Sequence, residues 1–373
     1  MLPPDVGSRG GAVDNIFIKD TQELVERPGA LETPFHEQDT FYTPNDRFFV
    51  CNVTTTPRVD PASWSLTIAG DAVATPLTLS LDGLTDFERV ELDVLMECAG
   101  NQRQLFEEIL KTPLDKRPHL VELRWMLGGV GMARWRGIRL RDVLERAGIM
   151  DDAYHVLPFG SDPSDEEPDG TCIPMPAAKA LHPDTLIALA MNGEALPADH
   201  GFPARLVVPG WVGTYSVKWL RRIEVTREHR WVSRNTKRYV MMGDAWDGQD
   251  WGPANGPNIT EHPVRSSLTL PWPAALAPGR HRIAGYARGG EEPIAAVVWS
   301  GDGGATWHDA QLDTTPARYA WAPFSFDWDA TPGEHTLMTR ATDAAGRTQP
   351  MEQPFNNGGY IFHMVHPHPV AVG

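Results

Sequence analysis

Short runs in which apolar and polar residues alternate predict β-strands along much of the chain. Residues 65–69 and 90–96 alternate in this way, as half-buried strands do. Residues 140–148 instead carry apolar side chains at helical spacing and end on Gly148, which suits the C-terminal end of a helix. Because strands and short helices mix without a regular strand–helix–strand order, residues 41–245 are expected to form an α+β domain.

A loop-forming segment divides this region from a second one. Residues 243–258 are dense in glycine, proline, aspartate and asparagine, which marks a boundary. Beyond it, residues 281–287, 294–300 and 335–343 have the composition of strands. Strands that recur about every 8–15 residues predict a β-sandwich of the immunoglobulin type over residues 255–373.

The composition is that of an acidic globular protein. Apolar residues make up 41% of the chain, and 13 tryptophans and 13 phenylalanines supply ample surface for a core. The formal net charge of −16 repels phosphate backbones and anionic lipids, which argues against nucleic-acid binding. No run approaches the roughly 18 consecutive apolar residues of a membrane helix, so no membrane span is predicted.

The two ends of the chain are expected to lie outside the packed units. Residues 1–40 are mixed and polar, which predicts an arm, and His363, His366 and His368 are expected to lie in a mobile tail. The first residues contain neither a charged start with an apolar core nor a twin-arginine motif. The sequence as written therefore predicts a cytoplasmic protein, or a periplasmic one if a leader has been removed.

Cys98 carries the first candidate chemistry, since Cys51, Cys98 and Cys172 are too few and too scattered for a disulfide framework or a zinc site. Two small residues follow Cys98 and allow a sharp turn that exposes the sulfur, and Asn101 can hold this turn. Arg103 places a positive charge near the sulfur, which lowers the pKa of a thiol and suits nucleophilic attack or binding of a soft metal. The alternative is an inert buried cysteine, which is also the expectation for Cys172.

A second segment gathers basic and hydroxyl side chains. His200 and Arg205 precede the apolar residues 206–208, and a loop rich in glycine then leads to Ser216 and Lys218. Each of these residues alone is more often a solvated surface group. As a set in an acidic chain, they predict a site for a phosphate or another anion.

These segments resemble the sulfite oxidase family of molybdopterin enzymes. The resemblance rests on Glu-Cys-Ala-Gly-Asn at 97–101, Asp-His-Gly-Phe-Pro at 199–203 and Ser-Val-Lys-Trp-Leu at 216–220. Further matches in family order are residues 43–46, 133–144, 191–194 and 300–307. The resemblance implies an α+β molybdopterin-binding catalytic domain over residues 41–245, followed by an immunoglobulin-like dimerisation domain over residues 255–373.

The resemblance also implies a site. One molybdenum would be held by a pterin dithiolene and by Cys98, with Arg103 and Trp125 at substrate-contacting positions. The positions that match cofactor-binding residues of the family are Phe49, Val50, Cys51, Asn52, Cys98, Asp162, His200, Arg205, Ser216, Val217 and Lys218. No haem is expected in this chain, because it has neither the length for an added haem domain nor a second candidate for haem ligands. Electrons would therefore pass to or from a separate partner such as a cytochrome, and the resemblance implies a homodimer.

At three positions the sequence departs from the family pattern, and these departures weaken the group of side chains that would bind an anionic substrate. Cys51 and Gly358 stand where arginines are expected, and Asp169 stands where a tyrosine is expected. The reaction implied is oxygen-atom transfer to or from a small substrate, with sulfite as the family default, and we expect poor oxidation of sulfite unless Arg47 substitutes as a cation. The alternatives are a sulfoxide-type reductase, a cofactor-carrying dimer without turnover, and a molybdenum-free thiol enzyme built on Cys98 and Arg103.

Overall fold

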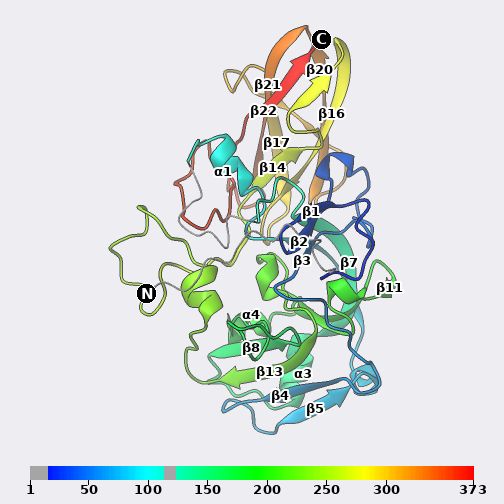
Figure 1. Ribbon diagram of the computed structural model, residues 1–373, viewed down its shortest axis with the longest axis vertical. Coiled ribbons are helices and arrows are strands. Elements are labelled where there is room, and N and C mark those ends of the chain that lie inside the picture. Colours follow the sequence, from blue (N-terminus) through cyan, green and yellow to red (C-terminus); the bar gives the residue numbers. More distant parts are fainter. Residues whose placement is uncertain (1–15, 113–122) are drawn as a thin grey trace, which may run out of the picture.

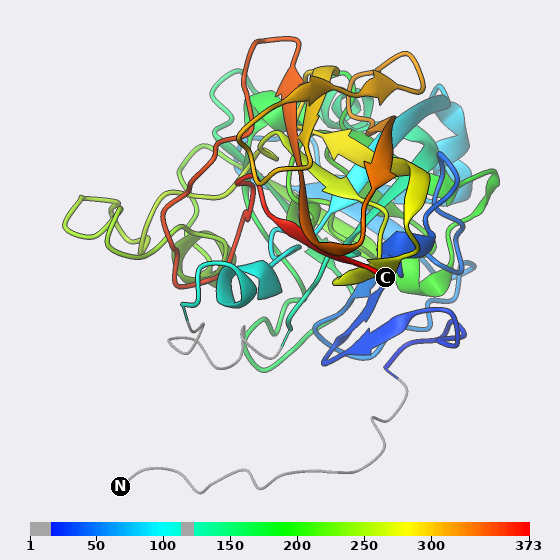
Figure 2. The same cartoon turned by 90° about the horizontal axis from the view of Figure 1, so that it is seen from above.

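The computed structural model describes residues 16–112 and 123–373, and it divides into two strand-rich regions (Figure 1). The first region carries β4 to β13 and short helices, and the second carries β14 to β22. In Figure 2, seen from above, the strands of the second region lie in front of the first. The predicted order of a mixed cofactor domain followed by a β-sandwich is confirmed, although the helices are few and short.

The first region contains two five-stranded sheets. One sheet has the order β11-β10-β7-β6, with β12 beside β10, and the other has the order β5-β4-β13-β8-β9. The strands of the first sheet are β6 (Val90–Glu97), β7 (Val130–Arg139), β10 (Leu186–Met191), β11 (Glu194–Ala195) and β12 (Arg205–Val207). The strands of the second sheet are β4 (Ser65–Ala69), β5 (Leu77–Ser80), β8 (His155–Gly160), β9 (Met175–Pro176) and β13 (Leu220–Thr226). The strands predicted at residues 65–69 and 90–96 are therefore β4 and β6.

Among the described residues of this region, three short α-helices accompany the strands. They are α1 (Gln104–Glu108), α3 (Leu140–Arg146) and α4 (Ala177–Ala180). The predicted helix is α3, and Gly148 beyond it has a φ of +72°, as a residue after a helix end often does. Leu140, Val143 and Leu144 are fully buried because their spacing places them on one face.

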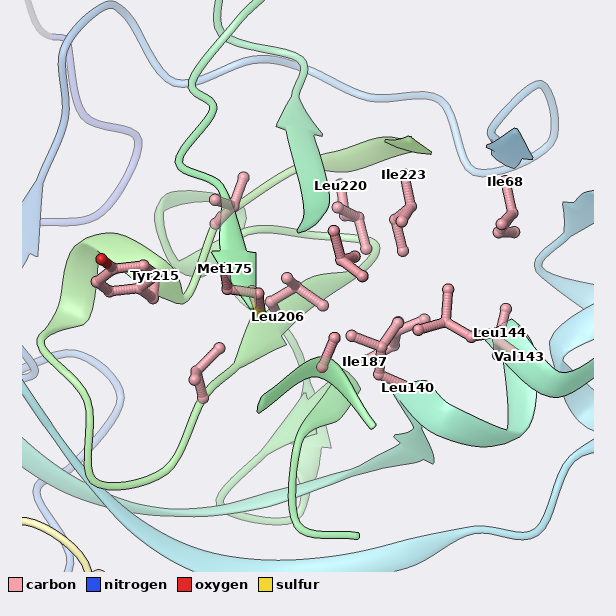
Figure 3. Packing of buried hydrophobic residues seen from close by; sticks show 14 of the residues in the cluster. Ile68, Leu140, Val143, Leu144, Met175, Ile187, Leu206, Tyr215, Leu220 and Ile223 are labelled. Atoms are coloured by element: carbon pink, nitrogen blue, oxygen red, sulfur yellow. The ribbon is translucent and has the colours of Figure 1, made fainter. Parts of the chain in front are cut away.

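The main core lies between α3 and the two sheets (Figure 3). Ile68, Ile187 and Ile223 from three strands contribute fully buried side chains to it, and so does Leu206 of β12. Tyr215, from the loop that follows β12, is also buried in this cluster. Burial of Leu206 and Tyr215, which directly adjoin Arg205 and Ser216, anchors the segment that carries the predicted anion site.

The second region is a sandwich of two sheets in which most neighbouring strands are antiparallel. One has the order β14-β16-β20-β19 and the other β15-β22-β21-β17-β18. Phe324, Leu337 and Val297 fill the space between them, as the alternation of the predicted strands requires. The strands are β14 (Arg265–Leu268), β15 (Ala274–Leu276), β16 (Gly279–Arg288), β17 (Ile294–Ser300), β18 (His308–Asp309), β19 (Gln311–Leu312), β20 (Ala322–Ala330), β21 (Gly333–Asp343) and β22 (His368–Val372).

The prediction of a free arm and a mobile tail is wrong for the described residues. Strands β1 (Val25–Arg27) and β2 (Ala30–Glu32) form a three-stranded sheet with β3 (Val50–Cys51). Leu31 is buried there against Val50, because a few apolar residues suffice to attach a short strand to an existing sheet edge. Residues 1–15 of the predicted arm lie outside the described residues.

At the other end, β22 pairs with both β15 and β21, so the C-terminal segment is part of the sandwich. His366 and His368 are buried, and Nε2 of His368 contacts the carbonyl oxygen of Pro271 at 2.8 Å. These two histidines, which the sequence places in a mobile tail, are therefore packed inside the protein. In the described part of the chain, no helix combines the length and apolar character needed to cross a membrane.

Candidate active site

A cavity of about 110 Å³, partly open to solvent, lies where β3, the end of β6 and the loop after β12 meet. The predicted cofactor-binding residues that line it are Phe49, Val50, Cys51, Cys98, Asp162, His200, Arg205, Ser216, Val217 and Lys218. Asn52 lies directly behind the lining, where its side-chain oxygen accepts a hydrogen bond from the ammonium of Lys218.

The turn after β6 presents Cys98 to the cavity. The N–H of Cys98 donates to the carbonyl oxygen of Gly129 at 2.9 Å, and the N–H of Asn101 donates to the carbonyl oxygen of Cys98 at 2.9 Å. The side-chain oxygen of Asn101 also accepts the N–H of Gly129 at 2.9 Å. Asn101 therefore holds the turn, which is the role that the sequence predicts for it.

Cys51 and Cys98 both line the cavity, and their thiols interact with each other. This contact lowers the pKa of Cys51 to about 7 and, together with burial, raises the pKa of Cys98 well above its usual range. Arg103 lowers the pKa of Cys98, as the sequence predicts, but the contact with Cys51 and burial outweigh this effect. Two adjacent thiols cannot both ionise easily, so the first proton lost belongs to the pair.

Arg205, which is buried, and Lys218, which is half-buried, also line the cavity, and neither pairs with a carboxylate of the described residues. The guanidinium of Arg205 donates to the carbonyl oxygens of His200 and Ser216, each at 2.9 Å, and contacts the sulfur of Met96. The ammonium of Lys218 donates to a carbonyl oxygen at 3.0 Å in addition to the side chain of Asn52. Burial lowers the pKa of Arg205 to about 9 and that of Lys218 to about 7.

The remaining predicted cofactor residues have structural partners as well as a place in the wall. Asp162 accepts the N–H and the hydroxyl of Thr171 at 3.0 and 2.7 Å. The hydroxyl of Ser216 accepts the N–H of Val208 at 3.1 Å. Burial lowers the pKa of His200 well below its usual range, so this imidazole is neutral.

The two residues predicted to contact substrate lie behind the cavity wall. Arg103 is buried and donates through Nε to the carbonyl oxygen of Gly358 at 3.1 Å and through Nη1 to that of Leu123 at 2.8 Å. Trp125 is fully buried, and its ring meets that of Phe49 edge-on at 5.8 Å. Neither side chain lines the cavity.

Of the three positions that depart from the family pattern, Cys51 lines the cavity, whereas Asp169 and Gly358 lie away from it. Asp169 is exposed, and its backbone oxygen accepts a hydrogen bond from Arg221 at 2.8 Å. A Cβ at Gly358 would lie 2.5 Å from the ring of Tyr360, so this ring fills the space beside it. The idea that Arg47 replaces the missing cation finds no support, because Arg47 pairs with Glu37 at 2.5 Å and is absent from the wall.

Arg234 is a wall residue that the sequence reasoning missed. It begins a π-helical segment (Arg234–Arg238) and donates to both carboxylate oxygens of Glu167 at 2.6 and 2.5 Å. Its Nη1 lies 3.2 Å from the hydroxyl of Thr214. The available signal was local: residues 230–238 hold four cations in an otherwise acidic chain.

These residues fit a molybdenum–pterin group. Arg205 is buried, Lys218 is half-buried, and the hydrogen-bond acceptors of both cations are neutral, so an anionic group would offset the cost of removing them from water. The Cys98 sulfur is a soft donor that suits molybdenum. The pterin phosphate would lie toward Arg205 and Lys218, and the metal would lie toward Cys98.

Comparisons with known proteins agree with this fit. The chain matches the oxidoreductase molybdopterin binding domain over residues 53–232 and the Mo-co oxidoreductase dimerisation domain over residues 257–371. It is 38% identical over 328 residues to the sulfite oxidase of Gallus gallus, which covers 84% of this chain and 69% of that protein. It is 31% identical over 350 residues to the sulfite oxidase of Arabidopsis thaliana, which covers 86% of each.

Other relatives are longer than this chain. The mitochondrial sulfite oxidase of Mus musculus is 36% identical over 327 residues, which are 83% of this chain and 57% of that protein. The chain thus spans little more than half of the mouse protein. Among solved structures, the sulfane dehydrogenase SoxCD from Paracoccus pantotrophus superposes with a TM-score of 0.79 at 25% identity, over 94% of this chain and 89% of the other.

Fold, site and domain matches together define a molybdopterin-dependent oxidoreductase with a dimerisation domain. The sequence identities to sulfite oxidases narrow this class to one family. The chain belongs to the sulfite oxidase family, as its sequence motifs predict.

Proposed function

We propose that this chain transfers an oxygen atom to or from a small sulfur compound that is less anionic than sulfite. When bound, the molybdenum–pterin group supplies the two-electron redox chemistry. Arg205 and Lys218 hold the anionic end of that group, and Cys98 binds the metal. The wall beside Cys98 then decides which substrate enters.

The thiol of Cys51 carries the proposal. It lies beside Cys98, where the family pattern has a cation. The nearby guanidinium of Arg234 is neutralised by its bidentate pair with Glu167, and Arg103 lies behind the wall. A compact anion must exchange its water for positive, hydrogen-bonding groups, so sulfite finds a poor site here.

Steady-state oxidation of sulfite, with ferricyanide or cytochrome c as acceptor, tests this proposal. We expect a high KM for sulfite in the wild type. Cys51→Arg is expected to lower that KM by about 10- to 10²-fold, because a hydrogen bond to a charged group contributes about 1.5–3 kcal/mol. Cys51→Ser is the matched control and removes the thiol without adding charge. A low-micromolar KM with rapid turnover in the wild type would restore sulfite as the substrate.

Reduction of a sulfoxide is the second candidate. Phe48, Phe49, Val53 and Met96 give the cavity apolar wall that suits a weakly charged molecule. Oxidation of a reduced dye by added sulfoxide measures this activity. If neither substrate supports turnover in protein that contains molybdenum, the cofactor-carrying dimer becomes the better description.

We also propose that the protein works as a homodimer and exchanges electrons with a separate protein such as a cytochrome. The match of residues 257–371 to a dimerisation domain supports the first point. The acidic net charge of −16 would favour a basic electron partner. A salt-dependent rate of reduction of a basic cytochrome, against a salt-independent rate with an uncharged acceptor, would test the second point.

A further inference from the structure

The turn that presents Cys98 is held by the second domain as well as by its own sheet. The carbonyl oxygen of Ala99 accepts the N–H of Ile361 at 2.8 Å. The side-chain amide of Gln102 donates to the hydroxyl of Ser267 on β14 at 2.7 Å. Both contacts join residues that are far apart in the sequence, so the two domains meet at this turn.

Glu97 makes the strongest of these connections. It is the last residue of β6, directly precedes Cys98, and is fully buried. Nε and Nη2 of Arg288 donate to its two carboxylate oxygens at 3.0 and 2.9 Å. Nη1 of Arg265 lies 3.4 Å from the same carboxylate. Both arginines are fully buried and come from strands β16 and β14 of the second domain.

The same carboxylate is tied to the turn itself. The side-chain amide of Asn101 donates to Glu97 at 2.6 Å, and the same amide donates to the carbonyl oxygen of Leu127 at 3.2 Å. Asn101 also closes the turn on Cys98 through its backbone N–H. Movement of the Glu97 carboxylate would therefore be transmitted to the residue that follows it.

The cluster is unbalanced in charge. One carboxylate faces two guanidiniums, and burial lowers the pKa of the adjacent His262 to about 3, so that imidazole is neutral. Among the described residues, Nε of Arg265, Nη1 of Arg288 and Nε2 of His262 have no hydrogen-bond partner. Glu97 is thus the group that holds two buried arginines together.

We propose that Glu97 is a positioning residue through which the second domain sets the direction in which β6 delivers Cys98 to the metal. Arg265 and Arg288 fix the carboxylate from outside the cofactor domain, and Asn101 carries that constraint into the turn. The inference rests on Cys98 as the metal ligand, and it is independent of which substrate the enzyme uses.

Glu97→Gln in the full-length, cofactor-loaded protein is the direct test. The amide keeps the shape but leaves two buried guanidiniums facing each other without a counter-charge. We expect altered g-values in the electron paramagnetic resonance spectrum of the Mo(V) form and a lower molybdenum content after dialysis. A misplacement of the ligand by about 1 Å would also lower kcat by about 10²-fold with little change in KM.

Two further variants keep the test sharp. Glu97→Gln combined with Arg265→Gln restores the net charge of the cluster and is expected to recover most of the wild-type spectrum and molybdenum content. Arg288→Lys keeps every charge but loses the bidentate fork, so it should fold and shift the spectrum in the same direction as Glu97→Gln.

Glu291→Gln is the matched control. It breaks another ion pair between the domains, with Lys179 at 2.7 Å, that lies outside the Cys98 turn. It should lower the thermal midpoint and leave the spectrum unchanged. An unchanged spectrum and molybdenum content in folded Glu97→Gln or Arg288→Lys would overturn the proposal, and failure of the double variant to recover the spectrum would overturn the pairing argument.

Discussion

Replacing Lys218 with methionine is expected to stabilise the cofactor-free protein. The Lys218 side chain is half-buried, and its ammonium donates to the side chain of Asn52 and to the backbone oxygen of Asp199. Burial lowers the pKa of Lys218 from 10.5 to about 7. Since the unfolded chain binds this proton more tightly, the lysine costs stability below pH 10.5. The cost grows as the pH falls to about 7 and is constant below that value.

The magnitude follows from the difference between 10.5 and about 7. At 1.36 kcal/mol per pKa unit, a shift of about 3.5 units corresponds to about 5 kcal/mol at pH 6. Methionine removes this cost but also removes two hydrogen bonds, which contribute about 1–1.5 kcal/mol each. The expected net gain in the free energy of unfolding is about 2 kcal/mol at pH 6. It turns into a loss at about pH 8.5, where the cost of burying the charge falls below the contribution of the two hydrogen bonds.

Guanidinium-induced unfolding at pH 6, 8 and 10, followed by tryptophan fluorescence, measures this gain. Lys237→Met, at an exposed position, is the control and should show no such dependence on pH. Loss of stability at pH 6 in Lys218→Met, or a gain that does not shrink with rising pH, would refute the reasoning. In the loaded protein the sign reverses, because methionine cannot pair with the anionic cofactor, so Lys218→Met should release it more readily.

Three further outcomes are expected. Cys98→Ser should keep the fold and the pterin but lower turnover more than tenfold (about 1.4 kcal/mol in the barrier), because a hydroxyl is a poor ligand for a soft metal. Turnover above a tenth of the wild-type rate would contradict this expectation. In cofactor-free protein, oxidised glutathione should join Cys51 and Cys98 in a disulfide while it is reduced to two thiols, and thiol titration should then find only the buried Cys172. Light scattering at micromolar concentration should give a dimer formed through residues 255–373, and a monomer mass would exclude it.

Much of the site was predictable because the family's motifs are local. The turn of residues 97–101 and the segment of residues 198–220 each supply several wall residues from one short stretch of chain. Small residues and a holding asparagine determine a turn without help from distant parts. The helix at Leu140–Arg146 was predictable for the same reason, since spacing alone defines its apolar face.

Contacts between distant segments were not predictable from single residues. Three such features depend on how strands and loops meet. They are the contact between Cys51 and Cys98, the ion pair of Arg234 with Glu167, and the burial of Arg103. Short polar segments gave misleading signals at both ends of the chain. The arm was expected to be free because its composition is polar, but a strand needs only a partner edge and a few apolar residues.

The sequence by itself determined the family, the order of the two domains and most of the residues that line the cavity, because these depend on local motifs and on the spacing of apolar residues. The tertiary structure decided which charges face the cavity and which are neutralised. It also decided that Glu97, unremarkable in sequence, is held by Arg265 and Arg288 from the second domain. The physical reason is that the energy of a charge depends on its burial and its partners, and both are set only when distant segments come together.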